Sequence, residues 1–139
     1  MAEAKKASFS FKAFRVPNFS YNDSENQEPE LILDFNPTGK FNSKSGVFFL
    51  TLEFKGFEKG KENNPIIQIK SISEFKFSKP LNSEEIPIYF FSNSIAIVFP
   101  YLRAFISNLT LQSNTGVMML GLMNFTGMGD DLKRNTSFE

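Results

Sequence analysis

Few residues in this sequence have the types and the spacing that chemistry requires. The best carboxylate candidates are Asp34 and Glu53, which would form a general acid–base pair only if their strands were neighbours and the two groups converged. Gly127-Met128-Gly129 lacks the lysine and the strand–loop–helix setting of a phosphate loop. Asp130-Asp131 lacks the glycine and the final glutamate of a calcium loop. We interpret all of them as solvent-facing segments and expect no catalytic and no metal-binding residue.

Two residue types are absent, and their absence removes whole classes of function. The chain has no histidine and no cysteine. It therefore lacks the commonest general base, the commonest zinc ligands, a thiol nucleophile and any disulfide. Lysine plus arginine (15) equals aspartate plus glutamate (15), and a net charge of zero disfavours a nucleic-acid-binding face. We expect a protein that is not an enzyme, with no cofactor and no nucleic-acid partner.

The length of 139 residues suits one domain with one core. We expect a flexible N-terminus at 1–7, a single domain at 8–132 and a flexible C-terminus at 133–139. The longest apolar stretches, Val117–Met123 and Ile95–Leu102, are far shorter than the roughly 20 residues of a membrane span. These features predict a cytoplasmic protein without stable membrane insertion.

Alternating apolar residues predict four strands, over 8–21, 30–36, 47–55 and 66–77. In the first, the apolar phase changes near Ala13, and Pro17 indicates an edge position or a bulge. In the fourth, a phase change predicts a bulge near Ser71. Much of the predicted sheet is apolar on both faces.

The period then changes to that of an amphipathic helix, capped by Asn93 or Ser94 and ending near Leu111. Pro100 marks either its first turn or a kink. Residues 124–132 predict a weak second helix that contains two glycines. Strands followed by helices indicate an α+β fold with an antiparallel sheet. Because one helix covers only one sheet face, we expect another copy of the chain on the other face.

Methionines cluster late in the chain, at Met118, Met119, Met123 and Met128. Flexible, polarisable methionines either fill an irregular gap in a core or form a surface that accepts many apolar sequences. Both readings stay open at this point. Proximity of the cluster to Leu31, Leu33 and Phe35 would favour the second.

One longer stretch carries a family resemblance. Phe99-Pro100-Tyr101, Arg103, Ile106 and Asn124-Phe125 stand in an order that resembles the SecB-type protein-export chaperones. PELILDFN at 29–36 looks like the second strand of that family, and FRVPNFSYN at 14–22 looks like its first. The resemblance spans about residues 8–132.

The resemblance implies a four-stranded antiparallel sheet with a long helix, assembled as a dimer of dimers. It implies an ATP-independent holdase for unfolded preproteins in protein export and translocation. The implied polypeptide-binding groove is lined by Leu31, Leu33, Phe35, Phe125 and Met128. The implied oligomer interface lies on the long helix, at Ile95, Val98, Leu102, Phe105, Ile106 and Leu109.

The resemblance also implies the export motor SecA as a partner. In the family, SecA docks on carboxylates of the flat sheet surface. The matching positions here are Asn18 and Asn22, and the net charge is zero. The last helix is also shorter than in the family. Two alternatives therefore stay open: a SecB-like chaperone dedicated to one partner, such as a toxin–antitoxin system, and a hydrophobic-ligand-binding or structural oligomer.

Overall fold

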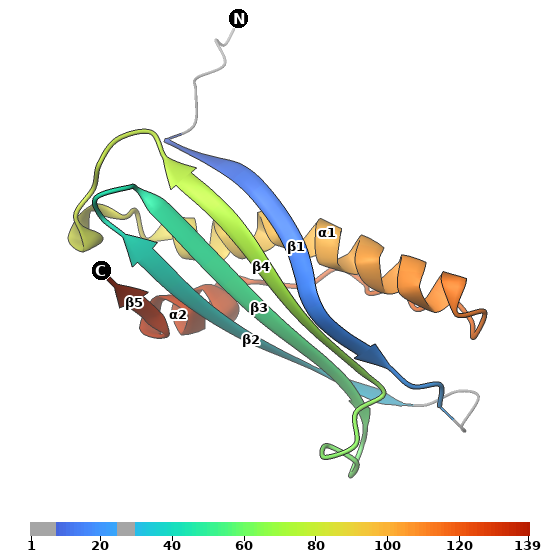
Figure 1. The fold of residues 1–139 in the computed structure, drawn as a ribbon. Coiled ribbons are helices and arrows are strands. Elements are labelled where there is room, and N and C mark those ends of the chain that lie inside the picture. Colours follow the sequence, from blue (N-terminus) through green and yellow to red (C-terminus); the bar gives the residue numbers. More distant parts are fainter. Residues whose placement is uncertain (1–7, 25–29) are drawn as a thin grey trace, which may run out of the picture.

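The computed structural model describes residues 8–24 and 30–139. In these ranges the chain forms one sheet and two α-helices (Figure 1). The elements in chain order are β1 (Phe9–Tyr21), β2 (Leu31–Asn42), β3 (Val47–Glu58), β4 (Ile67–Phe77), a short 3-10 helix (Ser83–Glu85), α1 (Tyr89–Gln112), α2 (Thr126–Arg134) and β5 (Thr136–Phe138). The expected flexible N-terminus at 1–7 lies outside the described residues.

The sheet has the strand order β1-β4-β3-β2-β5. Strands β1 to β4 pair antiparallel, whereas β5 pairs in parallel with β2 over Gly39–Phe41. The predicted α+β fold is therefore confirmed. The predicted count of four strands is wrong, because the described residues form a fifth.

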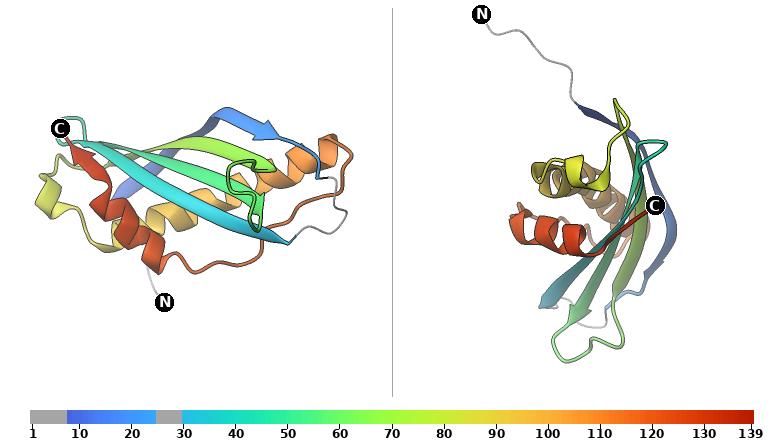
Figure 2. Two further views of the ribbon diagram at one scale, coloured as in Figure 1. Left: turned by 90° about the horizontal axis from the view of Figure 1, so that it is seen from below. Right: turned by 90° about the vertical axis from the view of Figure 1, so that its left-hand side faces the viewer.

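Both helices lie on the same side of the sheet, and we call the opposite side the open face (Figure 2). Strand β3 shows how the sequence separates the two sides. Phe48, Leu50 and Leu52 are fully buried on the helix side, whereas Phe49 and Glu53 alternate with them and are exposed. The apolar residues of one sheet face and one helix face thus form a single core.

The open face needs no second sheet to cover it. Its centre carries the charged residues Asp34, Glu53, Lys55 and Lys70. Water can solvate these groups without a partner, so the packing of a second copy on this face stays a prediction. The apparent apolarity of both faces came from isolated residues such as Phe49.

The irregularities of the sheet lie in β1. Its register with β4 shifts between Phe11 and Ala13 and again between Arg15 and Asn18. These shifts confirm the predicted phase change near Ala13 and the edge or bulge position of Pro17, since β1 is an edge strand. The bulge predicted near Ser71 is wrong, because β4 pairs with β3 in unbroken register.

The long helix begins earlier than predicted, at Tyr89 rather than near Asn93, and ends at Gln112. Pro100 lies in its interior, so it does not mark the first turn. A proline there removes a hydrogen bond to the carbonyl of Ala96. Ala96 and Pro100 are both exposed, so water can satisfy that carbonyl.

By length and composition alone, α1 could cross a membrane. Its mean hydropathy reaches 1.4 over an 18-residue window, and 39% of that window is buried in the structure. Unbroken apolar runs missed this because serine, asparagine and Pro100 interrupt them. Helices that form the core of a domain pass the same test, so the expected lack of membrane insertion stays a prediction.

The end of the chain is built into the fold, which corrects the expectation of a flexible C-terminus at 133–139. Residues 133 and 134 complete α2, and Thr136–Phe138 form β5. Helix α2 packs closely on α1, since a Cβ atom added at Gly129 would lie 2.8 Å from Cβ of Ser92. The glycine that weakens α2 as an isolated helix is what lets it dock.

Candidate functional site

Three of the predicted groove residues lie together on β2. Leu31, Leu33 and Phe35 alternate along the strand on its helix side, and each is half-buried. The ring of Phe35 lies 5.0 Å from that of Phe54 on β3 and 6.1 Å from that of Phe99 on α1. Phe35 is thereby held at the margin of the core, with part of its surface left open to a ligand.

The opposite side comes from the segment between α1 and α2. Phe125, also a predicted groove residue, packs on Phe99 with ring centroids 4.9 Å apart. Phe35 and Phe125 therefore meet on the same α1 residue, although they are far apart in the sequence. Met128, the last predicted groove residue, is partly buried against the same core.

Polar contacts hold the segment between the helices in place. The Met118 N–H donates to Thr110 Oγ1 (2.8 Å), and Ser107 Oγ donates to the Met118 carbonyl (3.1 Å). The hydroxyls of Thr115 and Tyr21 share a hydrogen bond of 2.7 Å. Because the backbone is anchored, the side chains that point outward are presented at defined positions.

These outward side chains are apolar, and the groove prediction did not include them. Leu122 is 98% exposed and Met119 is 78% exposed, beside a half-exposed Val117. Met118, Met123 and Met128 instead pack partly against the core. Met118, Met123 and Met128 thus fit the first reading, as residues that fill gaps at the margin of the core, and the second reading stays a prediction for the exposed Met119. The Met119 position was visible in the sequence as part of that cluster, whereas no signal singled out Leu122.

We call the apolar side chains of β2 and of the segment between the helices, together with Phe99 and Met128, the apolar seam. It comprises Leu31, Leu33, Phe35, Phe99, Val117, Met119, Leu122, Phe125 and Met128. Exposed apolar side chains of this kind mark binding surfaces for polypeptides, lipids or other copies of a chain. The seam has no charged member, so it offers burial of apolar surface and no chemistry.

Most of the interface residues predicted on α1 face the sheet of their own chain. Ile95, Val98, Leu102 and Ile106 are 0% exposed, because they pack on the sheet of their own chain. The remaining two, Phe105 and Leu109, are partly buried against the same core. Burial contradicts the prediction for Ile95, Val98, Leu102 and Ile106, because the 3.6-residue period marks the apolar stripe but does not say what covers it. Phe105 and Leu109 stay predicted interface residues.

The opposite face of α1 is the one available to another chain. Ile88 just before the helix, Tyr89 and Leu111 are exposed there, with Ala96, Pro100 and Ala104 between them. Tyr101, although half-exposed, packs instead against Phe11 and Phe14 of β1. The helix carries one charged residue, Arg103. Arg103 lies seven residues from Ala96 and therefore on this same face, so the exposed stripe is largely apolar with a single charge. Such a stripe can form a contact between helices of different subunits.

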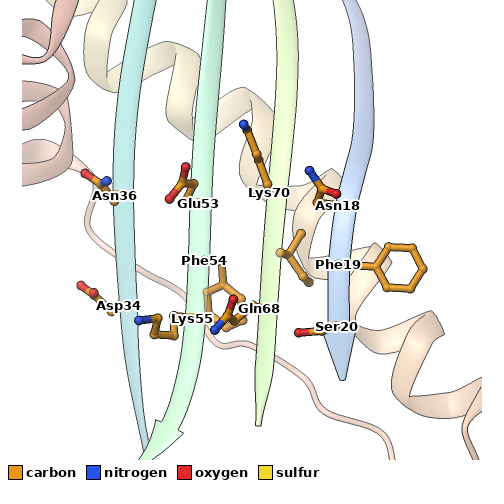
Figure 3. A pocket seen from close by; sticks show the side chains of 11 residues that line it. Asn18, Phe19, Ser20, Asp34, Asn36, Glu53, Phe54, Lys55, Gln68 and Lys70 are labelled. Atoms are coloured by element: carbon orange, nitrogen blue, oxygen red, sulfur yellow. The ribbon is translucent and has the colours of Figure 1, made fainter. Parts of the chain in front are cut away.

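The open face contains a polar hollow of about 510 Å³ (Figure 3). Its polar side chains come from all four antiparallel strands: Asn18, Ser20, Asp34, Asn36, Glu53, Lys55, Gln68 and Lys70. The predicted carboxylate pair of Asp34 and Glu53 required neighbouring strands and converging groups, and the first requirement holds because β2 and β3 are neighbours. In the register, however, Asp34 lies opposite Lys55 and Glu53 lies between Asn36 and Lys70.

Two acids and two lysines balance in this hollow, so the open face has no excess of negative charge there. Asn18 lies at its rim (Figure 3). Asn22 follows β1 and donates its backbone N–H to the Ile66 carbonyl (2.8 Å). The face therefore lacks the acidic character that the resemblance associates with SecA docking.

The described residues contain no cluster of three or more acidic residues that could hold a metal ion. Asp131, one of the paired acids in α2, forms a salt bridge with Arg134 of the same helix. This pair anchors the last turn of α2.

The architecture is a sheet covered on one face by a long helix and a short one, and this fold is similar to that of a SecB-like chaperone. Among solved structures, the chain is similar to the SecB-like chaperone Rv1957 of Mycobacterium tuberculosis, in complex with a ChAD peptide from the Rv1956 HigA1 antitoxin. The TM-score is 0.67 with 12% sequence identity, over 84% of this chain and 88% of that one. No protein-family model and no curated protein sequence matches the chain. The predicted SecB-type resemblance is thus confirmed at the level of the fold.

Proposed function

We propose that this chain is an ATP-independent chaperone that binds apolar segments of unfolded polypeptides along the apolar seam. The observation that carries the proposal is the contact of Phe35 and Phe125 with Phe99, at the end of a segment that exposes Met119 and Leu122. The protein would act in the cytoplasm, without a catalytic step and without a cofactor.

The mechanism is the burial of apolar surface. Each buried methylene contributes about 0.8 kcal/mol, so several side chains of a client give useful affinity. Leucine and methionine side chains adapt their rotamers and accept many sequences. Several weak sites along one chain add through avidity. Binding of this kind keeps apolar segments from aggregating, which is what preproteins awaiting export need.

Self-association through α1 is part of the proposal, since a dimer of dimers would align several seams. The interface would use the exposed stripe at Tyr89, Ala96, Pro100 and Ala104. Ala96→Glu places an unpaired charge in that stripe and should lower the molar mass measured by light scattering after gel filtration. Lys133→Glu, an exposed change on α2, is the control. An unchanged mass for Ala96→Glu would place the interface elsewhere.

A second candidate is a chaperone dedicated to one partner. The observation in its favour is the structural similarity to a SecB-like chaperone that is in complex with a peptide from an antitoxin. The same seam would serve both roles. The two candidates differ in selectivity: a general holdase protects several unrelated clients, and a dedicated one protects a single class.

The test is suppression of aggregation. A chemically unfolded, slowly folding protein is diluted into buffer with this chain, and light scattering is followed. We expect suppression, and we expect Met119→Ser with Leu122→Ser to weaken it, because both side chains are exposed and tolerate replacement. Phe49→Ser, an exposed apolar change on the open face, should leave it intact. If the chain suppresses aggregation of none of several clients, the general holdase is contradicted. If all variants suppress aggregation equally, client binding at the seam is contradicted.

A further inference from the structure

The segment between α1 and α2 has few attachments through its own backbone. It runs back from the end of α1 towards α2 without regular secondary structure (Figure 2). Within the part of the chain that the structure describes, no backbone–backbone hydrogen bond involves residues 115–124. The position of this segment is therefore set by side chains, either apolar ones that pack on the core or polar ones that bond its backbone.

Exposure alternates along residues 117–120. Val117 and Met119 are exposed, whereas Met118 is half-buried and Leu120 is buried. In a stretch with this two-residue alternation, the inward and the outward sets of side chains exchange places when the stretch is turned over about its own axis. The facing of the stretch therefore decides which methionine is offered to a ligand.

Apolar packing alone favours the observed facing only weakly. Turned over, the stretch would direct Val117 and Met119 inward in place of Met118 and Leu120, so an apolar pair would replace an apolar pair of similar size. A glycine lies near each end of the stretch, at Gly116 and Gly121, and no atom lies within 4 Å of a Cβ added at either one. Glycine backbones rotate freely, so both ends have the freedom to turn.

Two hydroxyls of α1 distinguish the two facings. The Met118 N–H donates to Thr110 Oγ1 (2.8 Å), and Ser107 Oγ donates to the Met118 carbonyl (3.1 Å). Thr110 is fully buried, and its own proton goes to the Ile106 carbonyl (2.9 Å), so its oxygen is free to accept. Both backbone groups of one residue are thus held by side chains three positions apart on the same face of α1.

We propose that Thr110, together with Ser107, is a positioning residue that sets the facing of residues 117–120. This inference rests on the proposed function, because the side chain that it selects for the apolar seam is Met119 rather than Met118. Turning the stretch over would carry the N–H and the carbonyl of Met118 away from α1 and break both hydrogen bonds. Two lost hydrogen bonds favour the observed facing by roughly tenfold or more.

The test measures how fast hydrogen peroxide oxidises each methionine, with peptide fragmentation by mass spectrometry to separate neighbours. Exposed thioethers react faster, so Met119 should be oxidised several-fold faster than Met118 in the natural chain, with Met128 of α2 as the internal reference. Thr110→Val, close to threonine in shape but without the acceptor, should speed oxidation of Met118 and slow that of Met119. Their rate ratio should fall by about threefold or more. Thr110→Ser keeps the hydroxyl and should restore the natural ratio.

A second pair of variants guards against a folding defect. Ser107→Ala should change the ratio in the same direction, and alanine at this half-buried position favours the helix. Ser113→Ala is the matched control, because Ser113 Oγ donates to the Leu109 carbonyl (2.8 Å) at the same end of α1 and does not bond the segment. An unchanged ratio in both Thr110→Val and Ser107→Ala would overturn the inference. Faster oxidation of both methionines would also overturn it, because the segment would then detach rather than turn over.

Client affinity separates this inference from the proposed function. Ser107→Ala should bind an unfolded client about twofold or more weakly than Ser113→Ala, measured by fluorescence anisotropy. Equal affinities together with a changed oxidation ratio would overturn the link between facing and binding. If the natural chain binds no client, the proposed function fails, and the oxidation ratio still decides whether the two hydroxyls set the facing.

Discussion

The ring of Phe125, just before α2, packs against the ring of Phe99 in the middle of α1, with 4.9 Å between the ring centroids. Phe99 is 4% exposed and also contacts Phe35 of β2, so it is the shared support of both sides of the apolar seam. The segment between the helices is thereby tied to the core at its end. The two sides of the seam are joined only through Phe99, so neither β2 nor the segment between the helices forms the seam alone.

Loss of the Phe125 ring should weaken client binding more than it weakens the fold. Phe125 is partly exposed, and an aromatic pair of this geometry contributes about 1 kcal/mol beyond its buried area. We expect Phe125→Ala to lower the affinity for an unfolded client several-fold, measured by fluorescence anisotropy. Phe125→Leu, which keeps most of the apolar surface, should bind nearly as well as the natural chain. Equal affinities for Phe125→Ala and the natural chain would contradict a role in binding.

The close approach of the two helices at Gly129 predicts a stability effect. An alanine Cβ there would lie 2.8 Å from Cβ of Ser92 and 2.9 Å from its backbone N. We expect Gly129→Ala to lower the free energy of unfolding by about 1–3 kcal/mol through overpacking. Gly127→Ala is the matched control, because no atom lies within 4 Å of its added Cβ. That variant should be about 0.5 kcal/mol more stable through its helix propensity. Denaturant unfolding measures both, and equal effects would contradict the tight contact.

Two buried serines on β4 should respond in opposite directions. Ser73 is 0% exposed, and its hydroxyl has no hydrogen-bond partner in the described residues. Ser71 is equally buried, but its hydroxyl donates to the Leu52 carbonyl (3.1 Å). We expect Ser73→Ala to raise the free energy of unfolding by about 1 kcal/mol and Ser71→Ala to lower it by about 1 kcal/mol. Destabilisation by both changes would indicate a partner for the Ser73 hydroxyl.

The pKa of Glu58 predicts a pH dependence. The hydrogen bond from Ser24 Oγ (2.6 Å) lowers the pKa of this carboxyl below its ordinary value, and the charge of Lys61 lowers it further, while desolvation opposes both. A carboxyl with a lowered pKa in the folded state stabilises the fold above its unfolded pKa. That contribution is lost as the pH falls through the folded pKa.

We therefore expect the melting temperature of the natural chain to fall on acidification more steeply than that of Glu58→Gln, which has no proton to gain. Ser24→Ala removes the leading cause and should raise the pKa of Glu58, observed directly in an NMR titration of the side-chain carboxyl. Parallel melting profiles for the natural chain and Glu58→Gln would contradict the assignment.

Local pattern was enough for much of the fold. Alternation of apolar residues located β1, β3, β4 and the first half of β2, which continues beyond the predicted end at Asn36 to Asn42. The phase change at Ala13 marked a true bulge in β1. The change to a 3.6-residue period located α1 but not its first turn, which begins at Tyr89 rather than near Asn93. The bulge predicted near Ser71 failed because small polar residues can also occupy core positions.

The candidate site was only partly predictable. Leu31, Leu33, Phe35 and Phe125 came from the family resemblance, and the structure brings the last two onto one residue. Leu122 has no local signal, because exposure is a property of what surrounds a side chain. The same reason explains the failure at Ile95 and Leu102, which a periodic pattern cannot assign to a core or to an interface.

By itself, the sequence determined which residues are apolar, with what period, and which chemistry is out of reach without histidine and cysteine. Those are properties of neighbours along the chain. Only the tertiary structure decided which side of α1 meets the sheet, that 136–138 extend the sheet beside β2, and that Phe35 and Phe125 share Phe99. These relationships join residues distant in sequence, and they depend on close packing, which no local pattern contains.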